Sequence, residues 1–361
     1  MPSPTSLIPL LVPRPIVHAH RAIGARAPGA TSSPQFRDGT FHNREPMQVV
    51  ESGSRRSIAL EFATKRDRGR PRGTVPLVRP QWPEPAAACA ATWLGHATVL
   101  LEVGGHRVLT DPVWSERVSP SAHVGPRRHH PVPAPIESLP RLDAVLISHD
   151  HYDHLDTATI DRLVALQDVP FVVPLGVGAH LRAWGVPAAR VVELDWEQSV
   201  ELDGLRLTCT PARHFSGRLF RSNLTLWSSW LVESGGRRAF FGGDTGYSAD
   251  FAELGRRHGP VDLTVLPIGA YDVRWPDVHL DPAEAVRVHR ELRGDVMLPI
   301  HWGTFDLAFH TWAAPADWAR SEAETHGVRL AQPRPGERVD VGAVLAGSGG
   351  LPTDEWWRDL G

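Results

Sequence analysis

Three histidines and one aspartate that could ligate metal ions stand within six positions, in the run His149-Asp-His-Tyr-Asp-His154. A spacing of two puts His149 and His151 on the same side of an extended chain, and Asp153 and His154 follow around the turn. Such a density of imidazoles does not suit a protein core, because each buried ring needs its own hydrogen-bond partner. The segment therefore predicts a site for two metal ions rather than a solvated histidine-rich loop.

Three further residues that suit metal ions each follow a predicted strand. His214 comes after the run 205–210, Asp244 ends the run 239–244, and His301 follows the run 296–300. Strand ends at one edge of a layered sheet are where a rigid scaffold can bring ligands from distant parts of the chain together. With the histidine-rich run, they make a predicted set of seven ligands for two metal ions.

The elements that must position these residues alternate between strands and helices. We expect a hairpin from 97–103 and 106–110 around Gly104-Gly105, and a buried strand at 143–148 just before the histidine-rich run. Further strands are predicted at 171–173, 190–194, 198–202, 205–210, 225–233, 237–242, 261–266 and 295–299, and helices at 157–166, 178–184, 249–257, 282–292 and 315–326. This order predicts one layered α/β domain. No glycine-rich phosphate-binding motif follows a strand, which argues against a nucleotide-binding fold.

The spacing of the seven residues resembles that of metallo-β-lactamase-fold hydrolases, in which an αββα sandwich carries a dinuclear site at one edge. The resemblance covers residues of about 90–332. It implies that His149, His151 and His214 hold one metal ion, that Asp153, His154 and His301 hold the other, and that Asp244 bridges them. Redox diiron members of that fold usually have glutamate where this chain has His151, which favours hydrolysis.

Several longer motifs are similar to a narrower family, the N-acyl-phosphatidylethanolamine-hydrolysing phospholipase D enzymes. These are Phe36–Asn43, Trp93–Thr98, Leu109–Pro112, Asp143–Asp156, His279–His289 and Ile300–Phe305. The resemblance implies a phosphodiester substrate, with His279 and His289 near its phosphate. His279, His289 and Asp153 are therefore the predicted catalytic residues. The lactonases that share the Gly-His-Ala-Thr type of motif match less well at 279–305.

Two more residues are expected to support the ligands. Asp111 follows the predicted strand 106–110 and precedes Pro112, where it could orient a ligand histidine through the other nitrogen of the ring. A turn or capping role is the alternative for Asp111. His96 precedes the predicted strand 97–103 and is expected to line the pocket. For His289 the alternative is a core histidine with a single hydrogen bond, because it shares a helix face with Ala285 and Leu292.

The composition places limits on location and partners. The chain has 361 residues with a net charge of -3, yet residues 1–80 carry 13 of its 38 Lys and Arg and only 5 of its 41 Asp and Glu. We expect a Pro- and Arg-rich arm at 1–80 followed by a hydrolase domain at 81–361, whose acidic balance argues against nucleic acid. The apolar run Leu7–Val12 is too short for a secretory signal, and no run is long enough to span a membrane. The two cysteines are expected to be reduced and buried.

The function expected from these observations and resemblances is that of a zinc-dependent hydrolase of the phospholipase D type. It would cleave a phosphodiester bond of N-acyl-phosphatidylethanolamine-like lipids. Two divalent ions about 4 Å apart can bind one hydroxide and one substrate oxygen, and imidazole-rich ligation suits two zinc ions, although iron and manganese are also accepted. A lactonase or other ester hydrolase on the same dinuclear site is the alternative, and a metal-stabilised binding protein without turnover is the alternative from another class. A cytoplasmic protein with peripheral membrane contact is expected, and a homodimer is left open.

Overall fold

The computed structural model describes residues 30–48, 61, 64, 69–218 and 221–361. The apolar run Leu7–Val12 lies outside the described residues, so the expectation about it is not taken further. Within the described residues, no helix has both the length and the apolar composition needed to cross a membrane.

Two seven-stranded sheets form the centre of the molecule. The first sheet has the order β18-β3-β4-β5-β6-β7-β8 and the second has the order β17-β16-β15-β14-β13-β10-β9. The strands of the first sheet are β3 (Cys89–Gly95), β4 (Thr98–Val103), β5 (His106–Thr110), β6 (Ala144–Leu146), β7 (Phe171–Pro174), β8 (Val191–Leu194) and β18 (Arg338–Val339). The strands of the second are β9 (Ser199–Leu202), β10 (Leu205–Thr210), β13 (Ser229–Ser234), β14 (Arg237–Phe241), β15 (Val261–Pro267), β16 (Gly294–Ile300) and β17 (Arg329–Leu330).

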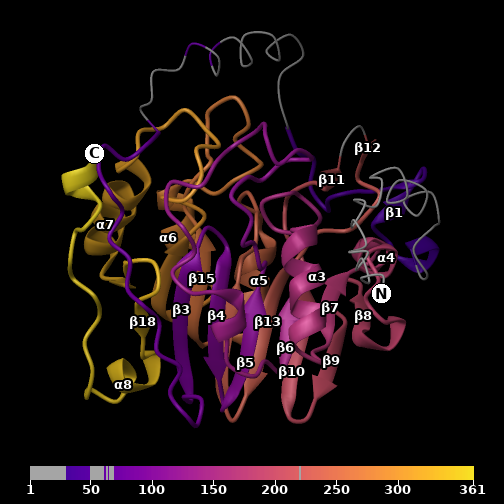
Figure 1. The fold of residues 1–361 in the computed structure, drawn as a ribbon, viewed down its shortest axis with the longest axis horizontal. Coiled ribbons are helices and arrows are strands. Elements are labelled where there is room, and N and C mark those ends of the chain that lie inside the picture. The colour runs from indigo at the N-terminus through magenta and orange to yellow at the C-terminus, as the bar shows by residue number, and fades with distance from the viewer. Residues whose placement is uncertain (1–29, 49–60, 62–63, 65–68, 219–220) are drawn as a thin grey trace, which may run out of the picture.

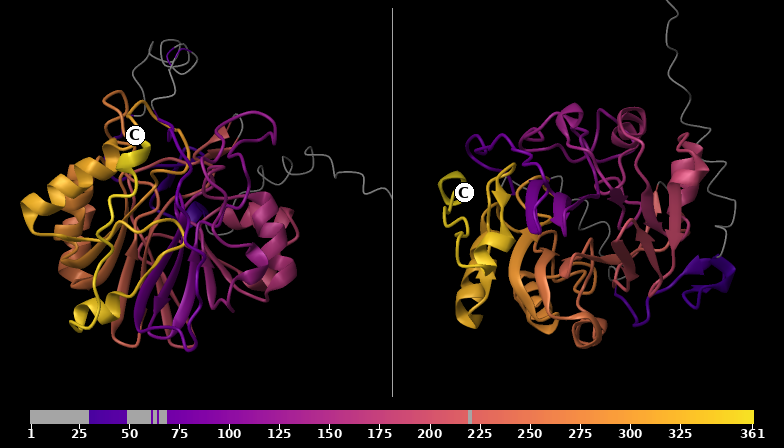
Figure 2. Two further views of the ribbon diagram at one scale, coloured as in Figure 1. Left: turned by 60° about the vertical axis from the view of Figure 1, so that its left-hand side comes forward. Right: turned by 90° about the horizontal axis from the view of Figure 1, so that it is seen from below.

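Helices cover the outer face of each sheet. The first sheet is covered by α3 (Thr157–Leu166) and α4 (Val177–Ala183), and the second by α5 (Asp250–His258), α6 (Pro282–Glu291) and α7 (Ala314–His326). The short helix α8 (Val341–Leu345) packs beside β3. The left view of Figure 2 shows the two helical layers on either side of the paired sheets. The chain thus has the predicted four-layer αββα architecture.

Alternation along the strands explains why the first sheet is buried on both faces. In β6, Ala144 and Leu146 point into the core between the sheets, whereas Val145 packs under the helices. In β7, Val172 faces the other sheet and Phe171 faces the helices. Period-two alternation of apolar residues on both faces is expected for strands enclosed between a sheet and a helical layer.

Parallel pairing places the ends of several strands at one edge. The strands β5 to β8 are parallel to one another, and so are β14 to β17. The loops that follow β5, β6, β14 and β16 therefore lie at the same edge, which is at the top of Figure 1. These loops carry Asp111, the histidine-rich run, Asp244 and His301.

Two details of the predicted elements were wrong. The strand expected at 225–233 begins only at Ser229, because the N–H groups of Leu226 and Ser228 donate to the carbonyls of Leu175 and Ser148 instead of a neighbouring strand. The hairpin at 97–103 is preceded by a further strand, β3, which pairs with β4 around a turn at His96. The remaining predicted strands and helices are present, with ends that differ by one or two residues.

Part of the N-terminal arm lies against the domain. The two short strands β1 (Phe36–Arg37) and β2 (Thr40–Phe41) form a hairpin around Asp38-Gly39, where both residues have positive φ. The Phe41 side chain is fully buried in the core between the sheets. A second two-stranded ribbon, β11 (Gly217–Arg218) with β12 (Arg221–Ser222), follows His214. The domain boundary at residue 80 stays a prediction.

Candidate metal centre

The first group of donor atoms combines three histidines and one aspartate. Nε2 of His149 lies 2.8 Å from Nδ1 of His151, and Nε2 of His214 lies 3.4 Å from the same Nδ1. Oδ2 of Asp244 lies 3.7 Å from Nε2 of His214 and 4.0 Å from Nε2 of His149. All four donor atoms lie within 4.8 Å of one another, which is the spacing needed to surround one ion.

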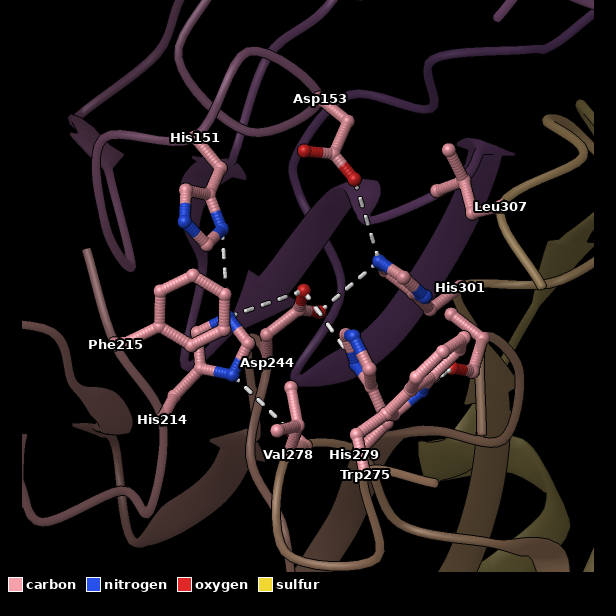
Figure 3. A pocket seen from close by; sticks show the side chains of 11 residues that line it. His151, Asp153, His214, Phe215, Asp244, Trp275, Val278, His279, His301 and Leu307 are labelled. Atoms are coloured by element: carbon pink, nitrogen blue, oxygen red, sulfur yellow. Dashed lines mark hydrogen bonds and ion pairs between the residues drawn. The ribbon is translucent and has the colours of Figure 1, made fainter. Parts of the chain in front are cut away.

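The second group shares a carboxylate with the first. Nε2 of His154 lies 3.2 Å from Oδ2 of Asp244, and Nε2 of His301 lies 3.1 Å from Oδ1 of the same side chain. Oδ2 of Asp153 lies 3.5 Å from both of these ring nitrogens. Asp244 therefore stands between the two groups, in the place that the family resemblance implies for a bridging ligand (Figure 3).

Several buried polar atoms in these groups have no hydrogen-bond partner among the described residues. They include Nε2 of His154, Nε2 of His301 and Oδ1 of Asp244. Buried polar groups of proteins are almost always hydrogen-bonded, and exceptions gather where a ligand or ion binds. Buried donor atoms that converge from different strand ends without hydrogen bonds fit a divalent metal pair, and imidazole with carboxylate suits zinc.

Carboxylates and imidazoles in the site shift one another's pKa values in opposite directions. Burial alone would raise the pKa of Asp244, but the neighbouring imidazoles, His154 foremost, hold it well below its usual range. Burial would lower the pKa of His301, but the charge of Asp244 raises it to about 9. Metal ions bound here would take the place of the protons that compensate the two carboxylates.

Partners on the outer side of each ring fix the orientation of the histidines. Nδ1 of His154 lies 2.7 Å from Oδ2 of Asp111, which leaves its Nε2 turned toward Asp244. The Ser148 hydroxyl donates to the same carboxylate at 2.5 Å and lies 2.9 Å from Nδ1 of His149. The carbonyl of Val278 lies 2.9 Å from Nδ1 of His214. Such outer hydrogen bonds select the tautomer that presents the other nitrogen.

A glycine allows the loop that carries Asp244 to approach the histidine-rich run. Gly243 has a φ of +58°, and a Cβ on it would lie 2.5 Å from Cβ of Ser148. Any other residue would therefore push Ser148 away from Asp111 and His149, in addition to straining the backbone. The Gly-Gly-Asp sequence at the end of β14 is explained by this contact.

His96 belongs to the same group of donor atoms as Asp153, His154 and His301. Its Nε2 lies 3.0 Å from Oδ2 of Asp153, and its ring centre lies 4.0 Å from that of His301. The turn that carries it has positive φ at Gly95 and His96, and is held by hydrogen bonds from His301 N–H to the His96 carbonyl and from His96 N–H to Oγ1 of Thr304. Backbone strain of this kind at non-glycine residues is concentrated at functional sites.

His279 lies in the pocket, as the sequence predicts. Asp281 caps α6 in a capping box with Glu284, so the preceding loop is fixed and directs His279 toward Asp244, with Nδ1 of His279 3.7 Å from Oδ2 (Figure 3). The pocket has a volume of about 290 Å³. Its lining consists of His151, Asp153, His214, Phe215, Asp244, Ala270, Trp275, Val278, His279, His301 and Leu307.

The structure does not bring His289 into the pocket. His289 is buried near the end of α6, and its Nδ1 lies 2.8 Å from the hydroxyl of Thr264, in the middle of β15. Because α6 begins at the metal centre and runs away from it, a residue in its last turn cannot reach the pocket. His289 is a core histidine with one hydrogen bond, which is the alternative that its helix face indicated.

Three supporting groups have no clear signal in the sequence. Ser148 is adjacent to the metal-ligating run, but a serine at the end of a strand is common. The Val278 carbonyl is a main-chain atom, so residue type gives no indication. Asn43 contacts His214 across 171 residues of sequence, and the motif Phe36–Asn43 was its only indication.

Comparison with known proteins agrees with this geometry. The family described as Beta-lactamase superfamily domain matches residues 106–302. The chain belongs to the beta-lactamase superfamily. The sequence is 49% identical to an uncharacterized protein of Mycobacterium tuberculosis, over 93% of this chain and 92% of that one. It is also 43% identical to N-acyl-phosphatidylethanolamine-hydrolyzing phospholipase D 1 of Caenorhabditis elegans, over 60% of this chain and 64% of that one.

Solved structures support the same fold. A metallo hydrolase from the hyperthermophilic archaeon Ignicoccus hospitalis superposes with a TM-score of 0.53 at 20% identity, and the match covers 70% of this chain and 97% of that one. A likeness at this level of identity shows the fold alone. The family and the fold together make this chain a metallo-hydrolase of the beta-lactamase superfamily.

Proposed function

We propose that this chain is a zinc-dependent phosphodiesterase of the phospholipase D type, acting on N-acyl-phosphatidylethanolamine-like lipids. The observation that carries the proposal is the shared Asp244, which lies 3.1 Å to 4.0 Å from ring nitrogens of both donor groups. A phosphodiester offers two unesterified oxygens, which suits a site with two cations close together. The relative from Caenorhabditis elegans, whose name states this activity, supports the choice of substrate.

The ligands in this proposal follow the two groups. His149, His151 and His214 would hold one zinc ion, and Asp153, His154 and His301 would hold the other, with Asp244 shared. His96 lies in the same donor group as Asp153, His154 and His301. When bound, the zinc ions would polarise the phosphoryl oxygens and lower the pKa of water at the site. The buried side chains that surround them keep bulk solvent away and hold the ligands in place.

His279 would act directly on the substrate. Burial lowers the pKa of His279 to about 4, so its imidazole is neutral at pH 7 and can donate one hydrogen bond and accept another. The ring lines the pocket and is directed by a capped helix, which makes its position definite. We assign it the role of hydrogen-bonding a phosphate oxygen or the leaving oxygen.

The walls of the pocket suit the part of a lipid next to its phosphate. Phe215, Trp275, Val278 and Leu307 form an apolar rim above the polar donor groups. The volume of about 290 Å³ lies at the lower end of the range for small-molecule pockets, which is about 300–1,000 Å³. We therefore expect the diester and its immediate surroundings to enter, while most of each acyl chain stays outside.

Turnover before and after chelation tests the proposal. The purified protein would be offered N-acyl-phosphatidylethanolamine in mixed micelles, with a lactone and a water-soluble phosphodiester in parallel. Chelator-sensitive release of phosphatidic acid, restored by zinc, is the expected result. Turnover of the lactone alone would replace the phospholipase assignment by a lactonase, and zinc binding without any turnover would favour a metal-stabilised binding protein.

A further inference from the structure

Both main-chain polar groups of His214 are paired with one side chain of the N-terminal arm. Nδ2 of Asn43 donates to the carbonyl of His214 at 2.7 Å, and Oδ1 of Asn43 accepts from the N–H of His214 at 3.1 Å. A side-chain amide has an N–H donor and a C=O acceptor, as a peptide group has. It can therefore form the hydrogen bonds that the main-chain N–H and C=O of a residue outside a sheet would otherwise lack. His214 lies four residues beyond Thr210, the last residue of β10, and among the described strands none pairs with it.

We propose that Asn43 is a positioning residue for the first metal ion, and that the arm is therefore part of the metal centre. The inference rests on the metal ligation proposed above, but not on the substrate. Asn43 fixes the main chain of His214, so that Nε2 of this ring points toward His151 and Asp244.

The Asn43 amide is itself held in place from both sides. We call residues 36–48 the strap. Before Asn43, Phe41 is fully buried between the sheets, and its N–H donates to the carbonyl of Asn223 at 2.8 Å. Nε1 of the buried Trp227 donates to Oδ1 of Asn43 at 3.0 Å. An amide fixed by the core on one side is a firm support for the loop on its other side.

The strap also contacts the loop that orients the ring of His214. After Asn43, the N–H of Gln48 donates to Oδ2 of Asp277 at 2.8 Å. Arg213 pairs with Asp277 at 2.9 Å and donates to the carbonyl of Pro46. Asp277 precedes Val278, whose carbonyl faces Nδ1 of His214. The strap thus supports the main chain of this histidine directly and its ring through the neighbouring loop.

These contacts belong to one metal group and not to the other. The hydrogen bonds of Asn43 within the described residues go to Met47, His214 and Trp227. None of these residues belongs to the group of Asp153, His154 and His301. Removing the amide should therefore weaken the binding of one of the two metal ions. A general loss of stability would weaken the binding of both.

Zinc titration against a chromophoric chelator measures this difference. We expect Asn43→Ala to bind one zinc ion at least roughly tenfold more weakly, as for other outer partners of metal ligands, and to bind the second with unchanged affinity. Arg44→Ala is the matched control, because Arg44 is the next residue of the strap, but its ion pairs within the described residues are with Glu197 and Asp250, and its guanidinium lies over the ring of Trp196. It should bind both ions like the unsubstituted protein.

A second variant keeps the test decisive if Asn43→Ala does not fold. Asn43→Asp keeps an oxygen for the N–H groups of His214 and Trp227, but sets another oxygen against the His214 carbonyl, and should also weaken one ion. Circular dichroism would show that each variant is folded. Two ions bound with unchanged affinity, or equal weakening of both in a folded variant, would overturn the proposal. Since zinc binding needs no substrate, failure to hydrolyse the lipid would refute only the proposed substrate.

Discussion

Asp244 is the residue on which both donor groups depend, because its two oxygens face ring nitrogens from each group. Asp244→Asn would keep the shape of the side chain but remove its charge and one oxygen. We expect turnover to fall more than roughly 100-fold, beyond the usual cost of losing an outer partner of a ligand, and metal analysis should show fewer than two ions per chain. Asp203→Asn, which alters an exposed carboxylate in the β9–β10 turn, is the control.

Substitutions at His279 and His289, which are ten residues apart, should have different effects, one on turnover and the other on stability. His279→Gln should lower turnover by about 10²-fold or more, as expected for a lost proton-transfer or hydrogen-bonding group, while two metal ions stay bound. His289→Gln should keep turnover but reduce the free energy of unfolding by about 1–3 kcal/mol, because the Thr264 hydroxyl loses a buried partner. Kinetics and urea unfolding on both variants check this, and a reversed pattern would contradict the assignment.

The seven predicted metal-ligating residues could be found from sequence because their chemistry is carried by residue type and position after a strand. The structure brings all seven together, and Asp111 lies against the ring of His154. His289 was predicted to lie near the substrate phosphate because it belongs to the same motif as His279. That motif starts at the pocket but continues along α6, which leads away from the metal centre. Asn43 could not be assigned a role, since only the folded chain brings its amide to His214.

At the scale of elements, the β3–β4 turn and the loop after β16 form one supporting unit. Thr304→Val would leave the buried N–H of His96 without its acceptor, because this N–H donates to Oγ1 of Thr304 at 2.8 Å. We expect the free energy of unfolding to fall by about 1–3 kcal/mol, measured by urea denaturation. Thr304→Ser keeps the hydroxyl and should cost less. Equal loss in both variants would show that packing of the methyl group, rather than the hydrogen bond, matters.

Elements with a clear period were predictable, and those fixed by distant partners were not. The hairpin at Gly104-Gly105 and the helix of residues 157–166 were predicted from local patterns. Residues 225–228 have the composition of a strand, but the N–H groups of Leu226 and Ser228 donate to the carbonyls of Leu175 and Ser148 in the facing layer. The two-residue strand β18 exists only because β3 offers it an edge.

At the scale of the whole molecule, the reactivity of the two thiols shows whether the core is packed tightly enough to exclude a reagent. Cys89 and Cys209 are free and buried, as the composition predicts. Burial raises the pKa of Cys89 to about 12 and also raises that of Cys209. A thiol is nucleophilic only as the thiolate, so a chromogenic disulfide reagent should react with neither cysteine in the native protein and with both in guanidinium chloride. Rapid reaction under native conditions would contradict the packed core.

Metal binding should also stabilise the whole fold, because the donor atoms come from four separate strand ends. Buried ring nitrogens and a carboxylate oxygen of His154, Asp244 and His301 converge without a hydrogen bond among the described residues, and this set does not exist in the unfolded chain. A ligand bound only by the folded state contributes about 2.7 kcal/mol per site at 100 times its Kd. We therefore expect chelation to lower Tm by several degrees and zinc to restore it.

The variant Asp244→Asn decides whether that shift arises at the predicted centre. With the shared ligand lost, zinc should change its Tm much less than that of the unsubstituted protein, while Asp203→Asn should show the full shift. Differential scanning calorimetry with and without zinc gives both values. An equal zinc-dependent shift in all three proteins would mean that the ion binds elsewhere, because a site that stabilises the fold through Asp244 cannot keep its effect when that carboxylate is gone.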